Sequence, residues 1–227
     1  MAGSGDGMKK FADRAAGGRA LAAEFDRRGL IPERWADPVV VLALPRGGLP
    51  VAVPVAERLG ARLSVVLVRK IGAPDNPELA IGAVAAVGDE VVTIRNESVL
   101  ADWPAAEQSF AAAEHRERAE LEGRRARYAS LTPALPSHAS IVLVDDGLAT
   151  GSTMLAAVAA VRTLDPASVT VAVPVGSRFA VQVIGAVADR VLCPLQPEPF
   201  LAVGYAYSDF RQVSDEEVTE LLAAHRR

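Results

Sequence analysis

Ile-Val-Leu-Val-Asp-Asp-Gly-Leu-Ala-Thr-Gly-Ser-Thr, residues 141–153, carries the strongest structural signal in this sequence. Its four leading apolar residues predict a strand buried on both faces, and two carboxylates follow where that strand ends. Residues 150–153 then open an apolar stretch, 154–161, that predicts a helix. A buried strand followed closely by a helix is typical of a parallel α/β sheet.

The same stretch offers two kinds of ligand contact. Hydroxyl and N–H groups at the predicted helix start favour a phosphate, because the helix dipole and the unbonded N–H groups attract anions. Asp145 and Asp146 are acceptors suited to sugar hydroxyls, so the stretch fits a ribose 5-phosphate. The alternative is an ordinary strand-to-helix turn, in which Ser and Thr cap the helix and Asp and Gly form the turn.

The rest of the chain alternates strand and helix patterns, which predicts an α/β fold with a doubly wound, mostly parallel sheet. In such sheets ligands bind beyond the carboxyl ends of the strands. Three loops, 45–48, 69–78 and 145–153, each follow a predicted strand and should therefore meet at one edge. The predicted strands are 39–44, 62–68, 79–87, 90–94, 141–144, 168–173 and 189–193. The predicted helices are 10–29, 49–59, 98–128 with a break near Trp103, 154–161 and 178–187, and a last one capped by Ser214.

We expect one domain, residues 9–227, behind a disordered N-terminus, 1–8. Within that domain the charged, helical pattern of 98–129 predicts a helical insertion. Further elements follow the last strand over 194–213, of which 194–199 is irregular and holds three prolines, and a helix over 214–227 ends the chain.

Composition narrows the class of protein. The net charge is −4, and no basic stripe or helix-turn-helix pattern points to nucleic acid. Cys193 is the only cysteine, which excludes an intrachain disulfide and a zinc cluster. No leader pattern and no membrane-spanning stretch is visible, so we expect a cytoplasmic protein that does not contact membranes.

Residues 141–153 resemble the PRPP-binding signature of type I phosphoribosyltransferases. That signature is an apolar strand followed by two acidic residues, three variable residues and Thr-Gly-x-Thr. PRPP is 5-phosphoribosyl-1-pyrophosphate. The resemblance implies that Asp145 and Asp146 are catalytic residues that accept hydrogen bonds from the ribose hydroxyls. It also implies a 5-phosphate site made of Ala149, Thr150, Gly151, Ser152 and Thr153.

The stretch Pro45-Arg46-Gly47-Gly48 resembles the family's first loop, where a strained peptide turns backbone N–H groups toward pyrophosphate. Two glycines permit close approach of the backbone, although tight turns use glycine equally often. By the same resemblance Arg69 and Lys70 are catalytic and bind pyrophosphate from the neighbouring strand end, while the alternative is a solvated basic pair. The implied cofactor is Mg²⁺, held by ligand oxygens and water, so no protein metal ligand is predicted.

Residues 71–82 correspond in position to the flexible loop of the family, whose closure would exclude water from the site. Gly72 and Gly82 are candidate hinges, and an ordinary surface hairpin is the alternative. Asp75 and Glu78 are candidates for a general base, if the acceptor must lose a proton.

The stretch 200–207 is similar to the Val-Gly-Tyr-Ala region of hypoxanthine-guanine phosphoribosyltransferases, so the 194–213 elements would form the family's hood. Phe200, Tyr205 and Tyr207 would then bind the acceptor by stacking on a planar ring. The alternative for each ring is packing in the core of the hood.

Two departures from the 6-oxopurine enzymes leave the acceptor undefined. Ala149 stands where those enzymes carry an acidic residue, and the stretch Pro174-Val175-Gly176-Ser177 lacks the Lys that reads the 6-oxo group. Over nearly its whole length the chain is most similar to a group of uncharacterised bacterial phosphoribosyltransferase-like proteins. The matching signatures are Phe11-Ala12-Asp13-Arg14, Leu44-Pro45-Arg46-Gly47-Gly48, Val68-Arg69-Lys70 and Pro197-Glu198-Pro199-Phe200.

The resemblance implies a Mg²⁺-dependent pentosyltransferase that moves a phosphoribosyl group from PRPP to a nitrogen or oxygen nucleophile and releases pyrophosphate. Its partners would be PRPP, a nucleobase or small-metabolite acceptor, and a second copy of the chain by family analogy. The alternative is a PRPP-binding regulatory protein on the same fold with little or no catalysis.

Overall fold

The computed structural model describes residues 11–30, 35–73, 76–132 and 135–225. The segment 1–8, which we expected to be disordered, lies outside the described residues. The strands are β1 (Val39–Ala43), β2 (Arg62–Ala73), β3 (Asn76–Val87), β4 (Glu90–Arg95), β5 (Ser140–Val144), β6 (Ser168–Ala172) and β7 (Arg190–Leu192). The α-helices are α1 (Arg14–Arg27), α2 (Gly48–Leu59), α3 (Glu97–Asp102), α4 (Pro104–Tyr128), α5 (Ser152–Arg162), α6 (Arg178–Gly185) and α7 (Asp215–Ala224), and η2 (Val203–Ala206) is a 3-10 helix.

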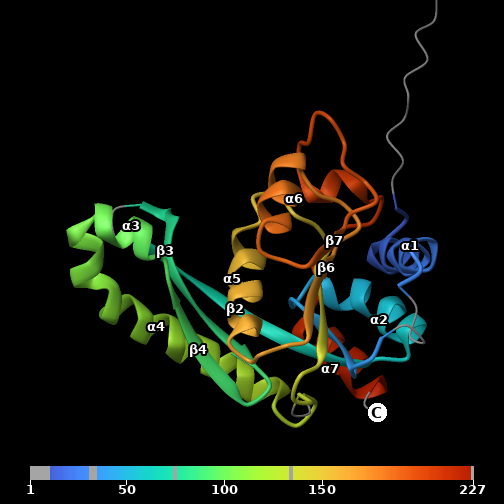
Figure 1. The fold of residues 1–227 in the computed structure, drawn as a ribbon, viewed down its shortest axis with the longest axis horizontal. Helices are drawn as coiled ribbons and strands as arrows, with labels where there is room; N and C mark the ends of the chain where they lie inside the picture. Colours follow the sequence, from blue (N-terminus) through green and yellow to red (C-terminus); the bar gives the residue numbers. More distant parts are fainter. Residues whose placement is uncertain (1–10, 31–34, 74–75, 133–134, 226–227) are drawn as a thin grey trace, which may run out of the picture.

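The described strands form one sheet in the order β4-β3-β2-β1-β5-β6-β7 (Figure 1). Strands β2, β1, β5, β6 and β7 pair in parallel, while β3 and β4 are antiparallel to their neighbours. The predicted doubly wound, mostly parallel sheet is therefore confirmed. None of the described helices combines the length and the apolar character needed to cross a membrane.

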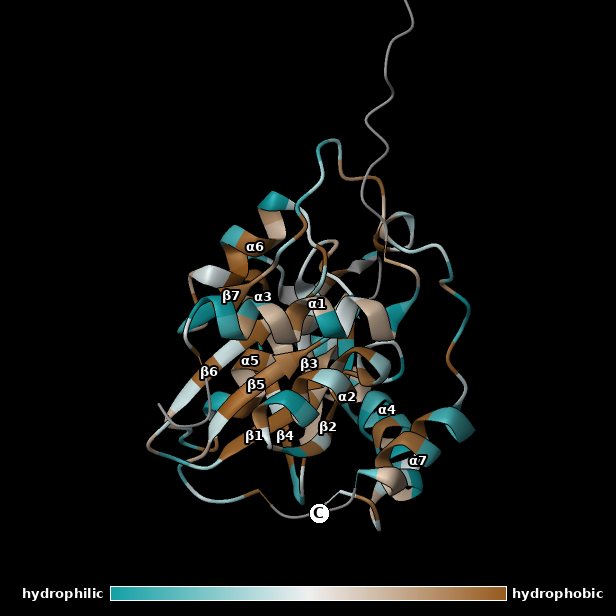
Figure 2. Cartoon of the chain, turned by 90° about the vertical axis from the view of Figure 1, so that its right-hand side faces the viewer, coloured by the Kyte–Doolittle hydropathy of each residue, from teal (hydrophilic) through white to brown (hydrophobic). Residues whose placement is uncertain are grey.

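Strand β1 is apolar along its whole length and β5 is apolar after Ser140, because helices cover both faces of the sheet; both strands are brown in Figure 2. Along β1, Val41 and Ala43 pack into one hydrophobic core with residues of α1, α2, α4 and α7. Val40 and Leu42 point the other way, into a second core with α5 and α6. Alternation of side chains along a strand thus divides the molecule into two layers around the sheet.

The hairpin of β2 and β3 corrects the predicted loop at 71–82. Residues 71–73 continue β2 and residues 76–82 belong to β3, so the described part of that stretch is a hairpin, the alternative that the sequence left open, and not an irregular loop. Ile71 and Ala73 are buried on one face, and the pairing with β3 supplies the backbone hydrogen bonds. Gly and Pro residues suggested a loop, but burial and pairing outweigh this local preference.

Gly82 has a packing role in this hairpin. A Cβ at this position would lie 2.5 Å from the carbonyl oxygen of Ile94 and 2.8 Å from the ring of Phe110, so the glycine permits close packing of β3 against β4 and α4. Asp75, a candidate general base, lies outside the described residues. The same holds for the side chain of Glu78, the second candidate.

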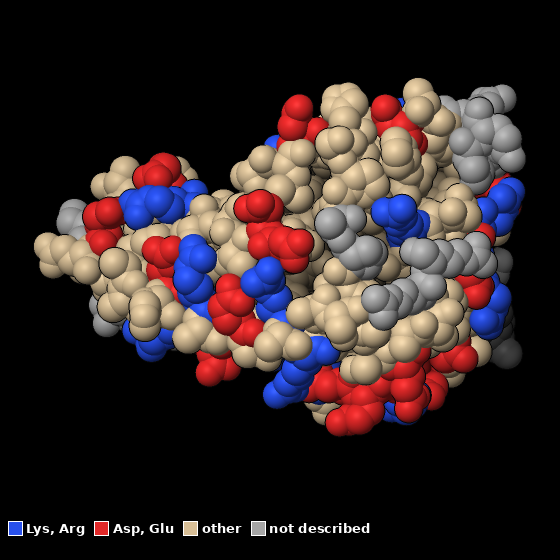
Figure 3. All heavy atoms as spheres, turned by 90° about the horizontal axis from the view of Figure 1, so that it is seen from below, with Lys and Arg blue, Asp and Glu red and all other residues tan. Residues whose placement is uncertain are grey.

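Helices α3 and α4 follow β4 and form, with the hairpin, the arm at the left of Figure 1. The predicted break at Trp103 is confirmed, because α3 ends at Asp102 and α4 begins at Pro104. Phe110 and Leu121 anchor α4 in the core, while its outer face is solvated. Figure 3 shows basic and acidic side chains interspersed on the surface of the arm, as expected for a solvated helix face.

Candidate active site

The candidate site lies where the direction of winding reverses. Strands β1 and β5 are neighbours in the sheet, but α2 after β1 and α5 after β5 pack in opposite hydrophobic cores. The loops after these two strands, 44–47 and 145–151, therefore border one crevice beyond the carboxyl ends. Open α/β sheets bind their ligands at such a switch point.

Two glycines let the first loop rest directly on the acid pair. A Cβ on Gly48 would lie 2.6 Å from the carbonyl oxygen of Val144, and a Cβ on Gly47 would collide with the carboxylate of Asp146. Gly47 itself has an ordinary helical φ of −62°, so close approach explains the glycine here. The peptide between Pro45 and Arg46 is cis.

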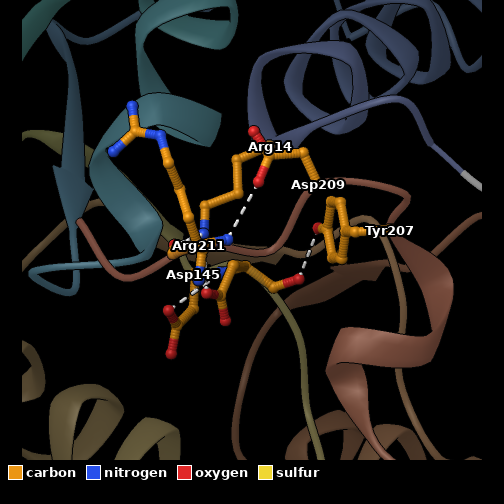
Figure 4. A network of polar contacts seen from close by, with 6 residues as sticks. Arg14, Asp145, Tyr207, Asp209 and Arg211 are labelled. Carbon is orange, nitrogen blue, oxygen red and sulfur yellow. Dashed lines mark hydrogen bonds and ion pairs between the residues drawn. The ribbon is translucent and has the colours of Figure 1, made fainter.

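Asp146 is held by an arginine from the first helix. The Arg14 Nε donates to Asp146 Oδ2 at 2.8 Å, and both side chains are mostly buried, with 11% and 17% of their surface exposed. The Arg14 guanidinium also donates to the carbonyl oxygen of Arg211 at 2.7 Å and lies 3.9 Å from the ring centre of Phe210. Figure 4 shows this network converging on the acid pair from α1 and the C-terminal loop.

The acid pair carries two carboxyl groups with raised pKa values. Burial raises the pKa of Asp145 well above its usual range, and the neighbouring charge of Asp146 raises it further. Burial also raises the pKa of Asp146, while the hydrogen bond and charge of Arg14 oppose that rise. Oδ1 of Asp145 accepts a hydrogen bond from the backbone N–H of Asp146 at 2.8 Å. Two adjacent buried carboxyl groups are unfavourable for folding alone, and such perturbed groups are typical of functional sites.

The predicted phosphate loop leads directly into α5. Gly151 is the N-cap residue with a left-handed φ of +81°, and no side chain caps this helix end. The exposed side chains of Thr150, Ser152 and Thr153 surround the turn, and the Thr150 and Ser152 hydroxyls lie 3.1 Å apart. The carbonyl oxygen of Ala149 accepts a hydrogen bond from the Ser177 hydroxyl at 2.7 Å. A helix start without a side-chain cap leaves N–H groups available for an anion.

Arg69 and Lys70 do not act from a strand end, because both lie within β2. Successive residues of a strand point to opposite faces, so the two cations separate. The Arg69 guanidinium pairs with Glu117 of α4 at 2.7 Å. Lys70 lines a largely apolar cavity of about 560 Å³ together with Ser152 and Thr153. The structure thus brings only Lys70 of the pair toward the phosphate loop.

The three hood aromatics separate into different environments. Tyr207 is buried and donates from its hydroxyl to the carbonyl oxygen of Asp146 at 2.6 Å. Burial, and then the charge of Asp146, raise the pKa of its phenol. The stacking role predicted for Tyr207 is therefore wrong, because its ring packs between Phe11 and Phe210.

The other two aromatics remain accessible. Tyr205 is 54% exposed, and Phe200 is half-buried against the small core of the hood. Both stay candidates for contact with an acceptor.

Sequence reasoning missed two sources of positive charge. Arg14 belongs to the signature 11–14, but no pattern in the sequence linked it to the acid pair. Arg124 and Arg127 lie on α4 and reach a cavity beside Arg46, whereas the charged pattern of 98–129 predicted only a helical insertion. No local signal locates either contact, because each depends on how distant elements pack.

A doubly wound sheet with an acid pair and an uncapped helix start at its switch point defines an α/β protein whose site is suited to a phosphorylated sugar. Comparison with known sequences gives the family, because the phosphoribosyl transferase domain matches residues 13–207. The chain belongs to the phosphoribosyl transferase domain family.

Relatives agree with this assignment. The chain is 40% identical over 221 residues to "Putative phosphoribosyl transferase Rv0571c" of Mycobacterium tuberculosis, an alignment that covers 96% of this chain and 48% of the relative. The chain thus spans about half the length of the curated relatives it matches. It is also similar to the crystal structure of TT1426 from Thermus thermophilus, with 42% identity, a TM-score of 0.80, and coverage of 96% of this chain and 100% of that one.

Proposed function

We propose that this protein transfers a phosphoribosyl group from PRPP to a nitrogen or oxygen nucleophile and releases pyrophosphate. One observation carries the proposal: the acid pair Asp145–Asp146 and the uncapped start of α5 flank a single switch point. A carboxylate pair would bind the ribose hydroxyls, and the N–H groups of the helix start would bind the 5-phosphate. This spacing suits one ribose 5-phosphate unit.

The reaction needs charge neutralisation on the leaving group. Mg²⁺ bound to the pyrophosphate oxygens of PRPP would neutralise part of that charge and orient the bond to be broken. Among the described residues, no group of three His, Cys, Asp or Glu side chains could hold a metal. We therefore propose that the ion arrives with PRPP and is held mainly by phosphate oxygens and water.

The acid pair would act through binding and orientation. Oxygens of Asp145 and Asp146 would accept hydrogen bonds from the ribose hydroxyls and favour the positive charge that develops on the sugar. Binding of both ends of PRPP would fix the bond between C1 and pyrophosphate relative to the incoming nucleophile. The nucleophile would reach C1 from the side of the hood, where Tyr205 and Phe200 offer a partly apolar surface.

Pyrophosphate release from PRPP in the presence of Mg²⁺ is the direct test, with purines, pyrimidines and small hydroxylated metabolites as acceptors. We expect release with one acceptor class, and its loss when Mg²⁺ is chelated. The double substitution Asp145→Asn with Asp146→Asn should abolish PRPP binding while the circular dichroism spectrum stays unchanged. Failure of the wild-type protein to bind PRPP would refute the proposal.

A regulatory role on the same fold is the second candidate. It is favoured by Ala149, which places no ionisable side chain beside the phosphate loop. PRPP binding without pyrophosphate release for any acceptor would support this candidate over the enzyme.

A further inference from the structure

A second cavity, lined mainly by polar atoms, opens beside the first loop of the candidate site. It has a volume of about 370 Å³ and lies between Pro45-Arg46, the middle of β2 at Leu67 and Val68, the last turns of α4 and the start of α7. The cavity is therefore continuous with the loop proposed for pyrophosphate. Its far wall comes from α4, an element of the arm.

Three guanidinium groups line this cavity, from Arg46, Arg124 and Arg127. Arg127 is already neutralised, because its Nη1 lies 2.5 Å from Oδ2 of Asp215. The other oxygen of Asp215 accepts a hydrogen bond from the Tyr128 hydroxyl at 3.1 Å. The carboxylate of Asp215 is thus largely satisfied by residues of α4.

Two positive charges in this wall lack a hydrogen-bonded counter-charge within the described part of the chain. The Arg46 Nη1 lies 3.9 Å from Oδ1 of Asp215, too far for a hydrogen bond. Arg124 makes no hydrogen bond or ion pair with any other residue that the structure describes, and Glu120 is the one further carboxylate in the wall. A guanidinium keeps its charge at every physiological pH, and its planar fork matches phosphate oxygens. This cavity is therefore suited to a multiply charged phosphate group.

The location of the basic cavity indicates which charged end of PRPP it would bind. Ser152 and Thr153, at the proposed 5-phosphate site, line the other cavity together with Lys70. The basic cavity begins instead at Arg46, on the side of the sheet that carries α4 and α7. A PRPP molecule placed across the switch point would direct its two charged ends toward these two cavities.

We propose that α4 is part of the substrate site: Arg124, together with Arg46, binds the pyrophosphate group, and Glu120 weakens that binding. The inference rests on the proposed function and extends it, because it assigns a binding role to an element outside the sheet core. Substituting Arg124 should spare the fold, since its side chain is exposed. The arm then does more than support the hairpin of β2 and β3.

Calorimetric titration with the two halves of PRPP tests this inference. Inorganic pyrophosphate with Mg²⁺ reports on the basic cavity, and ribose 5-phosphate reports on the acid pair and the phosphate loop. In Arg124→Gln we expect pyrophosphate to bind about tenfold more weakly, the loss typical of a hydrogen bond between charged groups, and ribose 5-phosphate to bind as in the wild type. In Glu120→Gln we expect the opposite sign, tighter pyrophosphate binding, because a repelling charge is removed.

Arg116→Gln is the matched control, since Arg116 is an exposed arginine of α4 that bonds the carbonyl oxygen of Ala112 and does not line the cavity. Unchanged pyrophosphate affinity in Arg124→Gln, or an equal loss for both halves, would overturn the inference. A wild-type protein that binds ribose 5-phosphate but not pyrophosphate would overturn it and leave the ribose site standing. Binding of neither half would refute the proposed function and this inference together.

Discussion

Replacement of Arg14 by glutamine should both destabilise the protein and make its stability more dependent on pH. The Arg14–Asp146 pair is mostly buried, so the substitution leaves a buried carboxylate without its counter-charge. Breaking one side of a buried pair typically costs about 3–5 kcal/mol. The hydrogen bond to the Arg211 carbonyl and the contact with the Phe210 ring are lost as well, but these contributions share one side chain and do not simply add. We expect a loss of about 3 kcal/mol, near the lower end of that range, because glutamine can still donate one hydrogen bond.

The destabilisation caused by Arg14→Gln should increase as pH rises. Arg14 opposes the rise in the pKa of Asp146 that burial causes, so the substitution should raise this pKa further. A carboxyl group with a higher pKa in the folded state than in the unfolded state binds more protons when folded, and its destabilisation grows as pH rises between the two values. The effect of Arg14→Gln should therefore be largest near neutral pH and should shrink as pH falls toward the unfolded pKa of an aspartate, about 4.

Urea unfolding monitored by circular dichroism, at several pH values, measures the loss of unfolding free energy and its pH dependence. In a thermal unfolding experiment, a loss of about 3 kcal/mol corresponds to a fall in melting temperature of roughly 6–12 °C for a domain of this size. Arg19→Gln is the matched control, because Arg19 is an exposed residue of the same helix. In an Asp146→Asn background the effect of Arg14→Gln should largely vanish. A loss below about 1 kcal/mol, or an equal loss with and without Asp146, would show that the pair does not hold α1 to the site.

The remaining predictions concern the acid pair and the residues around it. Asp145→Asn should stabilise the fold near neutral pH by on the order of 1 kcal/mol, because the raised pKa of Asp145 means that its charged form is unfavourable in the folded protein. This gain should disappear below about pH 4, and thermal unfolding at several pH values measures it. Gly47→Ala should displace the carboxylate of Asp146 and weaken PRPP binding about tenfold, which calorimetry would detect; unchanged affinity would contradict the packing described. Tyr207→Phe should cost about 1 kcal/mol of unfolding free energy by removing the hydrogen bond to the Asp146 carbonyl, whereas the exposed Tyr205→Phe should be neutral in the same denaturation experiment.

The core of the fold could be predicted from the sequence because its signals are local. Buried parallel strands are continuous apolar runs, and the run 141–144 predicted β5 to within one residue. The helix start at Ser214 could also be predicted, and in the structure the Ser214 side chain accepts a hydrogen bond from the N–H of Glu217, as a capping residue does. The antiparallel hairpin of β2 and β3 could not be predicted, because Gly72 and the nearby prolines suggested a loop. Pairing with β3 extends β2 through this stretch.

In the candidate site, too, the local features could be predicted and the long-range contacts could not. The acid pair and the turn at 149–153 are contiguous, so the type and spacing of their residues determine what they present. Tyr207 was assigned to the acceptor because the stretch 200–207 resembles the hood of a related family, and only the packing of Phe11 and Phe210 showed that its ring is internal. Arg69 and Lys70 were treated as one cationic pair until their place inside a strand separated them.

The sequence by itself determined a parallel α/β sheet and, at the end of one strand, a carboxylate pair followed by a Thr-Gly-Ser-Thr turn that opens a helix. These features need only the geometry of consecutive residues, because hydrogen-bonding pattern and side-chain period are local properties of the backbone. The tertiary structure alone decided that Arg14 neutralises Asp146, 132 residues away, and that Arg124 of α4 faces the cavity at Arg46. Contacts of this kind depend on how helices pack around the sheet, and the charge balance of the site therefore follows from the fold as a whole.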